Sequence, residues 1–233
     1  MKLITWLLTA LVLCSLTACG GGEDVPEPTP VVTVTPAPTP VPTPEPEPAD
    51  TDLVPIRKYI PDIQVDLRYA TTRNFTGKVI YDFDEPYLRY GTVKKLMGVQ
   101  ETLRAQGYGL LIWDGWRPMS AQFKLWEVVP DPVYVANPTT GYSSHSCGDT
   151  VDLTLIALDG RTVEMPSEFD EFAAIADRDY SDVSETARAN ALFLQTTMEN
   201  AGFTGYFGEW WHFSDNDDYS IEDVRDLEVP HGN

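Results

Sequence analysis

The sequence predicts an α+β domain in which a mainly antiparallel sheet is flanked by helices. Two long segments carry the amphipathic pattern of helices, and several short segments rich in β-branched and aromatic residues are typical of strands. These segments do not alternate in strict strand–helix–strand order, which argues against a parallel, doubly wound sheet. The domain predicted for residues 51–233 is long enough to bury one hydrophobic core.

The first strand and the first long helix are expected in the first half of this domain. Residues 63–70 (IQVDLRYA) alternate between apolar and polar side chains, which predicts a strand. Residues 92–107 predict a helix that Thr92 caps and Gly107 ends. Its expected apolar stripe consists of Val93, Leu96, Met97 and Leu103.

The remaining elements follow in the second half. Residues 109–114 (GLLIWD) and 151–158 (VDLTLIAL) predict buried strands, and a turn at 159–161 leads into a short expected strand at 162–165. Residues 184–202 predict the second long helix, with Ser184 as its N-cap and Gly202 at its end. The aromatic segment 203–214 is expected to be strand-like.

Residues 1–18 have the pattern of a bacterial lipoprotein signal peptide. Lys2 precedes an apolar stretch that is short for a membrane span, and the stretch ends in Leu16-Thr17-Ala18-Cys19. We expect cleavage before Cys19 and lipidation of its thiol. A plain secretory signal with an incidental cysteine is the alternative.

Residues 19–50 predict an extended linker. Ten of the 19 prolines fall between Glu23 and Asp50, so this segment buries no core and favours a polyproline-like conformation. Together with the signal, it predicts a protein held at the cell envelope, anchored by lipid to a bacterial membrane and facing outside the cytoplasm.

The charge and the cysteines exclude several classes of protein. A formal net charge of −20 without a basic cluster argues against nucleic acid as a partner and against charge-driven attachment to anionic lipid. Once Cys14 has left with the signal and Cys19 is lipidated, Cys147 is the only thiol, so no internal disulfide is expected. The oligomeric state is left open by the sequence.

Four side chains suggest a metal centre. His145 and Asp152 lie in one segment, and Glu209 and His212 lie in another. Two imidazoles, one ligating carboxylate and one spare carboxylate would suit a catalytic zinc site. By spacing alone, histidines hydrogen-bonded within the core remain an equal alternative. Glu209 and His212 could reach one metal only if the chain bends between them or if Glu209 lies in a turn before a strand.

Several segments resemble one family of zinc peptidases. SSHSCGDTVDLTL (143–155) is similar to the S-x-H-x-x-G-x-x-x-D signature of the D-alanyl-D-alanine dipeptidases, and GEWWHF (208–213) resembles their E-x-W-H signature. IWDGWRPMSAQ (112–122) is similar to their D-x-x-R-P segment. The resemblance implies a zinc fold shared with D,D-carboxypeptidases and the hedgehog signalling domain.

The resemblance also implies roles for individual residues. His145, Asp152 and His212 match the ligands of one zinc ion per chain, and Glu209 matches the general base. Arg117 matches an arginine that stabilises the oxyanion, with a purely structural salt bridge as the alternative. Ser143 and Ser144 are expected either to bind a substrate carboxylate or merely to shape the loop.

The expected activity is zinc-dependent hydrolysis of D-alanyl-D-alanine, or of a close D,D-dipeptide, in peptidoglycan metabolism. Two alternatives stay open: a D,D-carboxypeptidase that trims stem peptides, and a non-catalytic wall-binding module.

Three further residues have uncertain roles. Cys147 is a possible fourth zinc ligand or a small loop filler, and Asp149 is either exposed or an anchor for a substrate ammonium. His231 is expected in a solvated tail. Candidates for the pocket, by proximity to the motifs, are Tyr69, Asp66 and Asp114.

Overall fold

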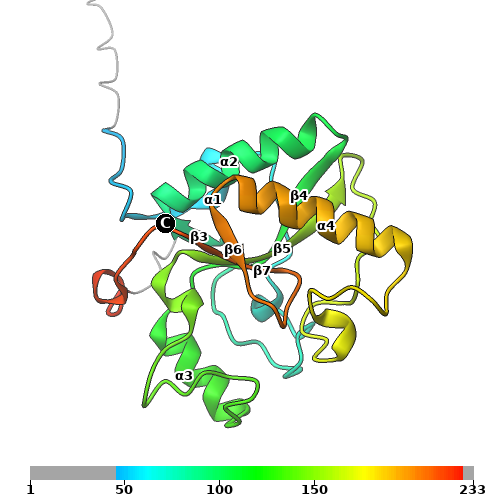
Figure 1. Cartoon of the computed structure of the whole chain (residues 1–233). Helices are drawn as coiled ribbons and strands as arrows, with labels where there is room; N and C mark the ends of the chain where they lie inside the picture. Colours follow the sequence, from blue (N-terminus) through cyan, green and yellow to red (C-terminus); the bar gives the residue numbers. More distant parts are fainter. Residues whose placement is uncertain (1–45, 228–233) are drawn as a thin grey trace, which may run out of the picture. The chain divides into compact units, whose positions relative to one another are not determined.

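A five-stranded mixed sheet forms the centre of the computed structural model, which describes residues 46–227 (Figure 1). The predicted signal peptide, Cys19, the linker up to residue 45 and His231 therefore lie outside the described residues. Strand β2 pairs with β4 in parallel, and the other three neighbouring pairs are antiparallel, which confirms a mainly antiparallel sheet. In spatial order the strands are β2 (Gln64–Val65), β4 (Tyr108–Asp114), β5 (Thr150–Ala157), β7 (His212–Asp215) and β6 (Phe203–Gly205).

The two long helices, α2 (Tyr90–Arg104) and α4 (Glu185–Asn200), run side by side over the sheet (Figure 1). Helix α2 packs on β4, and α4 packs on β5 and on the edge strand β6. Side chains alternate between the two faces of a strand, so Val151, Leu153 and Leu155 lie on the opposite face of β5 from Asp152. All three are buried in the hydrophobic core. One face of β5 therefore supplies the core, and the other is available for polar side chains.

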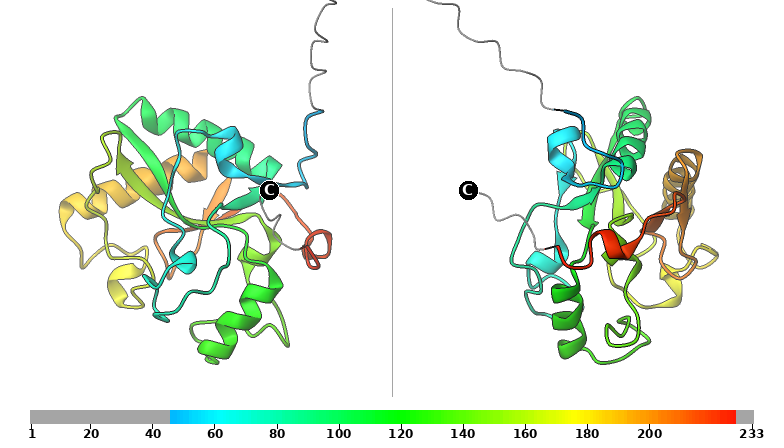
Figure 2. Two further views of the ribbon diagram at one scale, coloured as in Figure 1. Left: turned by 180° about the vertical axis from the view of Figure 1, so that it is seen from behind. Right: turned by 90° about the vertical axis from the view of Figure 1, so that its left-hand side faces the viewer.

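The remaining elements surround this sheet (Figure 2). Strands β1 (Leu53–Pro55) and β3 (Tyr87–Arg89) form a small antiparallel sheet, and the short helix α1 (Ile56–Tyr59) follows β1. Helix α3 (Met119–Val128) lies apart from α2 and α4. Among residues 46–227, no helix combines the length and the apolar character that crossing a bilayer requires.

Arg89 is a fully buried cation at the end of β3. Its guanidinium donates hydrogen bonds to the carbonyl oxygens of Thr51, Cys147 and Ser220, at 2.6, 2.7 and 2.6 Å. Its backbone N–H donates to the carbonyl of Gly148. Buried charges are stable only when they are well hydrogen-bonded, and these carbonyls meet that need. Arg89 thus joins three distant parts of the chain.

Most of the predicted elements are present. Strands β4 and β5 match the expected segments closely, and the aromatic segment contains β6 and β7. Ser184 caps α4 as predicted, because its Oγ accepts a hydrogen bond from the N–H of Ala187. Helix α3 was not foreseen from the sequence.

Four predictions about the elements were wrong. The expected strand 63–70 ends at Val65, and residues 68–70 form a 3-10 turn. Residues 162–165 make only an isolated bridge, between Thr162 and Ile156. Thr92 lies inside α2 and donates a hydrogen bond to Asp215, and Met97 is 42% exposed, because the buried face of the helix passes through Val99 instead.

Candidate active site

The pairing of the strands places three functional side chains in one row across the sheet. Asp152 on β5 lies opposite His212 on β7 and opposite Asp114 on β4. Directly opposed residues of antiparallel strands share a face, so these three side chains point to the same side. A register shift between Ile112 and Asp114 marks a bulge, a feature that redirects the end of a strand.

His145 reaches this row from a tight loop between α3 and β5. The loop is a 3-10 turn, Ser144–Cys147, and it ends at Gly148 with φ +80°. This left-handed backbone conformation favours glycine, and a Cβ on Gly148 would also lie 2.7 Å from Leu53 Cδ2. The backbone N–H of Arg117 donates to the carbonyl of His145, which fixes the loop to the end of β4.

The hydrogen bonds of His145 leave one ring nitrogen free for a cation. Its Nδ1 lies 3.0 Å from the carbonyl oxygen of Gly115, which can only accept, so Nδ1 carries the proton. In the neutral ring, the Nε2 lone pair then faces Asp152 Oδ2 at 3.3 Å. Burial lowers the pKa of His145, but Asp152 and Asp114 outweigh it and raise this pKa to about 9. The site therefore attracts positive charge between these two atoms.

The three candidate ligands fit a metal ion. Their ligand atoms all lie within 4.8 Å of one another. His212 Nδ1 lies 3.0 Å from Asp152 Oδ1, yet this buried oxygen receives no well-formed hydrogen bond. Burial raises the pKa of Asp152, but the histidines His145 and His212 outweigh it and lower the pKa, so the carboxylate is charged. A charged, incompletely bonded carboxylate between two imidazoles is a suitable donor set for a divalent cation.

Glu209 lies in the turn between β6 and β7, as the spacing required. The N–H of Tyr206 donates to the carbonyl of His212 and closes the turn, inside which Glu209 Oε2 lies 3.5 Å from His212 Nδ1. Burial, together with the carboxylate of Asp152, raises the pKa of Glu209. A carboxylate with a raised pKa beside a candidate metal site is suited to proton transfer.

Arg178 holds this turn from behind. Its Nε donates to the carbonyl of Tyr206 at 2.8 Å, and its Nη2 donates to the carbonyl of His212 at 2.9 Å. The guanidinium also lies over the ring of Phe213, at 4.4 Å from its centroid. A Cβ on Gly205 would lie 2.2 Å from Arg178 Cζ, so the close approach requires glycine. Arg178 therefore fixes both ends of the segment that carries Glu209.

Arg117 lines the pocket and also forms a buried salt bridge with Asp114. Its Nη2 donates to Asp114 Oδ2 at 2.6 Å, and its Nη1 and Nε donate to Gln122 and Tyr81. It also lies 4.9 Å from the centroid of the Tyr69 ring. The guanidinium lines the pocket while these buried partners hold it in place. It is thus a fixed positive charge at the site.

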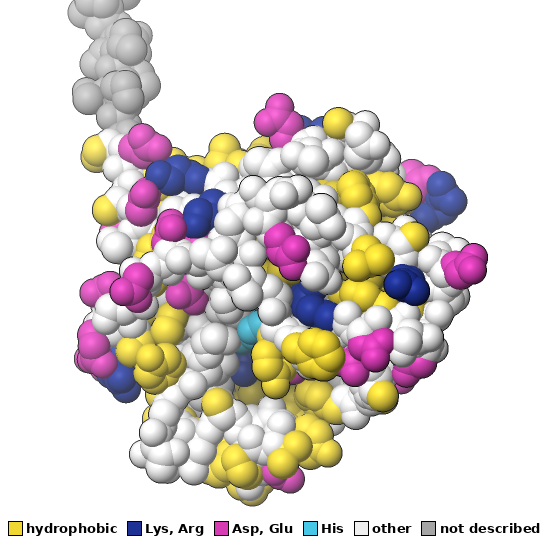
Figure 3. Space-filling model, viewed as in Figure 1, with side chains coloured by type: hydrophobic (Ala, Val, Ile, Leu, Met, Phe, Trp, Pro, Cys, Tyr) yellow, Lys and Arg dark blue, Asp and Glu magenta, His cyan; other side chains and the backbone are white. Residues whose placement is uncertain are grey.

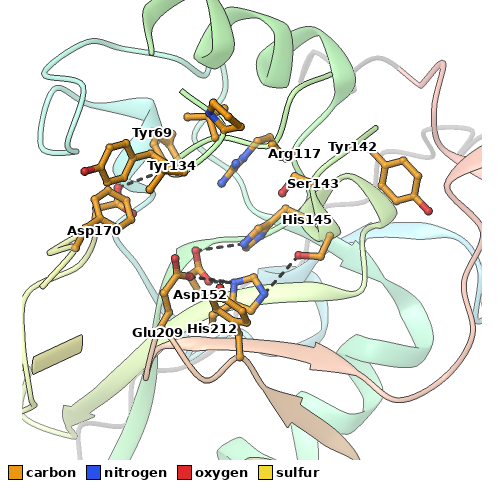
Figure 4. A pocket seen from close by; sticks show the side chains of 17 residues that line it. Tyr69, Arg117, Tyr134, Tyr142, Ser143, His145, Asp152, Asp170, Glu209 and His212 are labelled. Carbon is orange, nitrogen blue, oxygen red and sulfur yellow. Dashed lines mark hydrogen bonds and ion pairs between the residues drawn. The ribbon is translucent and has the colours of Figure 1, made fainter. Parts of the chain in front are cut away.

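These groups line a pocket of about 320 Å³ (Figure 3). This volume is at the small end of the range for small-molecule sites. Figure 4 shows Asp170, Tyr69 and Tyr134 on one side of His145, Asp152 and His212, and Ser143 and Tyr142 on the other. The pocket therefore has two chemically different ends, with the candidate metal centre between them.

Asp170 is the main site residue that the sequence did not reveal. Its Oδ2 accepts a hydrogen bond from Tyr69 Oη at 3.1 Å, and its backbone has φ +59°, which is uncommon for a residue other than glycine. Burial and the carboxylate of Asp152 raise the pKa of Asp170 to about 8, although Tyr69 and Arg117 act in the opposite direction. It lies in a long loop without a recognisable motif, so no local signal identified it.

The structure also places the lesser candidates. Ser143 and Ser144 both line the pocket, and Ser144 Oγ lies 3.4 Å from His212 Nε2. Cys147 is buried outside the cluster of possible ligands, which contradicts a fourth-ligand role, and burial raises the pKa of its thiol to about 11. Asp149 accepts a hydrogen bond from Thr150 and does not line the pocket, so it is neither fully exposed nor an anchor for substrate.

Neither Asp66 nor Asp114 lines the pocket. Asp66 pairs with Arg68 at 3.0 Å and with Arg73. Asp114 accepts hydrogen bonds from Tyr81 and Arg117. Both acids are therefore structural partners of nearby cationic or phenolic side chains, whereas Tyr69 lines the pocket as expected.

The chain is similar to known proteins over most of the described residues. The family described as D-ala-D-ala dipeptidase matches residues 49–230. The D-alanyl-D-alanine dipeptidase of Escherichia coli (strain K12) is 37% identical over 163 residues, covering 70% of this chain and 84% of the relative. That of Enterococcus faecium is 36% identical over 171 residues, covering 65% and 85%.

Two solved structures are also similar. VanYB in complex with D-Alanine-D-Alanine has a TM-score of 0.37 and 16% identity, covering 60% of this chain and 75% of that one. The LdcB LD-carboxypeptidase has a TM-score of 0.41 and 19% identity, covering 77% and 74%.

Proposed function

Because this chain belongs to the D-Ala-D-Ala dipeptidase family, we propose that it hydrolyses D-alanyl-D-alanine, or a close D,D-dipeptide, with the help of one zinc ion. The products would be free D-amino acids, which links the reaction to peptidoglycan metabolism. The observation that carries the proposal is the convergence of His145, Asp152 and His212 in a pocket that also contains Glu209 and Arg117.

His145, Asp152 and His212 would hold the zinc ion. Two imidazoles and one carboxylate are typical of catalytic zinc sites, whereas structural sites are usually closed by cysteines. When bound, zinc would polarise the scissile carbonyl and make the attacking water more acidic. The hydrogen bond from His145 to Gly115 supports this role, because metal-binding histidines commonly donate their second ring N–H to a carbonyl.

Glu209 would transfer the proton, and Arg117 would stabilise the negative charge that develops on the substrate. Glu209 is positioned to accept a proton from the attacking water, and its raised pKa suits the later transfer of that proton to the leaving amine. As the carbonyl carbon becomes tetrahedral, its oxygen gains negative charge. The fixed guanidinium of Arg117 offers donors to that oxygen, and the loss of one such donor typically slows a reaction about a hundredfold or more.

The two ends of the pocket fit the two ends of a free dipeptide. Asp170 would accept the substrate ammonium, because Tyr69 occupies only one of its oxygens. Ser143 lies on the other side of the candidate metal centre (Figure 4), and Ser144 lies next to His212. The hydroxyl groups of both serines would donate to the substrate carboxylate. A small pocket with an acid at one end and donors at the other matches a short zwitterion.

Release of D-alanine by zinc-loaded and chelator-treated protein tests this proposal. We expect hydrolysis of D-Ala-D-Ala only with the metal, and much slower hydrolysis of a pentapeptide ending in D-Ala-D-Ala. Faster cleavage of the pentapeptide would favour a D,D-carboxypeptidase. Zinc binding without release of D-alanine from either substrate would favour a non-catalytic wall-binding module.

We also propose that the enzyme acts at the cell envelope, attached to a bacterial membrane and facing outside the cytoplasm. The support is the sequence pattern of residues 1–18, with Cys19 as the lipidated residue and residues 19–50 as a spacer before the domain of residues 51–233. Mass spectrometry of the mature N-terminus should find a lipid-modified Cys19, and Cys19→Ser should release active protein from the membrane. A soluble wild-type protein that retains residues 1–18 would contradict the proposal.

A further inference from the structure

Exposed aromatic rings gather at the rim of the pocket. Tyr134 is 48% exposed and Phe172 is 43% exposed, although large apolar side chains usually bury more of their surface. Both line the pocket. Further exposed hydrophobic side chains that line the same pocket are Val133, Tyr142 and Tyr206.

Tyr134 and Phe172 meet although they come from different loops. Tyr134 follows α3, and Phe172 lies in the long loop between β5 and α4. Their ring centroids are 5.0 Å apart, within the range of a direct aromatic contact. Phe75, from a third segment, packs edge-on against Phe172 at 5.2 Å. These rings thus form a continuous aromatic wall.

This wall stands at the Asp170 end of the pocket. Phe172 lies two residues after Asp170, and Figure 4 shows Tyr134 beside Asp170 and Tyr69, away from Ser143. If the ammonium of a dipeptide pairs with Asp170, any additional residue on its amino side must extend toward these rings. The wall therefore lies where a longer peptide would continue.

We propose that Tyr134 and Phe172 form a steric stop that restricts the substrate to two residues. This inference rests on the proposed function and identifies the side chains that set the length of its substrate. The steric stop acts separately from Asp170, which distinguishes a free ammonium from an amide by its charge. A longer peptide presents an amide instead of an ammonium to Asp170, and it also collides with the Tyr134–Phe172 contact.

Kinetics with three substrates test the stop. The variants are Phe172→Ala, Tyr134→Ala and the double variant. The substrates are D-Ala-D-Ala, N-acetyl-D-Ala-D-Ala and L-Lys-D-Ala-D-Ala. The tripeptide adds bulk, whereas the acetylated dipeptide removes the ammonium and adds little bulk. Phe123→Ala is the matched control, because Phe123 is 48% exposed on α3 and does not line the pocket.

We expect each alanine variant to raise kcat/KM for the tripeptide relative to D-Ala-D-Ala, and the double variant to raise this ratio by about tenfold or more. The kcat/KM for the acetylated dipeptide, relative to that for D-Ala-D-Ala, should change much less. Phe123→Ala should leave all of these ratios unchanged. Because each ring is replaced separately, poor folding of one variant leaves the other to give the result.

Two results would overturn the stop. One is an unchanged ratio in all three variants, and the other is a wild-type protein that cleaves the tripeptide as well as the dipeptide. If zinc-loaded wild type cleaves neither, the proposed function fails instead. In that case, calorimetry measures the affinities of the zinc-loaded wild type and variants for D-Ala-D-Ala and for the tripeptide. A higher affinity for the tripeptide relative to D-Ala-D-Ala in the variants would support the steric stop, and an unchanged ratio would overturn it.

Discussion

Replacing Asp170 with asparagine should stabilise the zinc-free protein at alkaline pH while it weakens catalysis. Asparagine has nearly the same volume as aspartate and tolerates the positive φ of this position. It cannot ionise, however. The folded wild type must hold a charged carboxylate in a partly enclosed pocket at alkaline pH, whereas the variant has no such cost.

The magnitude follows from the pKa of Asp170, which rises from 3.8 to about 8 on folding. Between these values the folded protein binds more protons at Asp170 than the unfolded chain does, so this carboxyl makes the protein less stable as the pH rises. From about pH 5 to about pH 8, three pH units at about 1.36 kcal/mol each give a loss of about 4 kcal/mol. Because the carboxyl still faces the pocket, solvent reduces this value, and we expect about 1 to 4 kcal/mol.

Denaturant unfolding of chelator-treated wild type and variant at both pH values measures this difference. The advantage of Asp170→Asn should grow between about pH 5 and about pH 8, then level off above the pKa. Glu171→Gln, a change in the exposed neighbouring acid, is the control and should show no comparable growth. In the zinc-loaded enzyme, loss of the ion pair with the substrate ammonium should lower kcat/KM about tenfold to a hundredfold, mainly through KM.

A pH-independent stability difference would refute the reasoning about the buried charge. Unchanged kcat/KM would refute the assignment of Asp170 to the substrate ammonium. The two measurements are independent, so either part of the argument can fail alone.

Three further changes test the candidate site. Glu209→Gln should keep one zinc ion per chain by metal analysis and lower kcat by about a hundredfold to ten-thousandfold; a variant with wild-type turnover would exclude Glu209 as the base. Asp152→Ala should abolish the rise in Tm that zinc gives the wild type, and a retained rise would show that the metal binds elsewhere. Gly205→Ala should lower both Tm and kcat, because its Cβ would collide with Arg178. Gly98→Ala in α2, where a Cβ meets nothing within 4 Å, should instead stabilise the protein by about 0.5 to 1 kcal/mol. Equal effects of the two changes would contradict the role of Arg178 in holding the turn between β6 and β7.

The sequence located the candidate catalytic groups better than the pocket that surrounds them. His145, Asp152, Glu209 and His212 lie in short motifs, and each motif is positioned by a local element such as a tight loop, a strand or a hairpin turn. The position of Asp170 has no such local basis. Its side chain reaches the pocket only because a long loop folds back over the sheet toward Tyr69, more than a hundred residues away in the chain.

The errors within α2 have a similar cause. The helical pattern allowed either Met97 or Val99 on the buried face, since both are apolar and both are compatible with a stripe. The structure selects Val99, and Thr92 faces inward to donate to Asp215. Which face of a helix is buried depends on partners from distant strands, here Asp215. The sequence of the helix alone does not identify such partners.

The three carbonyls that converge on Arg89 make the loop of residues 144–148 sensitive to cleavage of the chain near residues 51 and 220. Proteolytic trimming that removes the segment around Thr51 or around Ser220 would leave the guanidinium with fewer acceptors in the interior. One of the acceptors that would remain is the carbonyl of Cys147, which lies two residues from His145. We therefore expect a nick far from the pocket to disturb His145, a candidate metal ligand, while the sheet stays folded, so that activity disappears before secondary structure does.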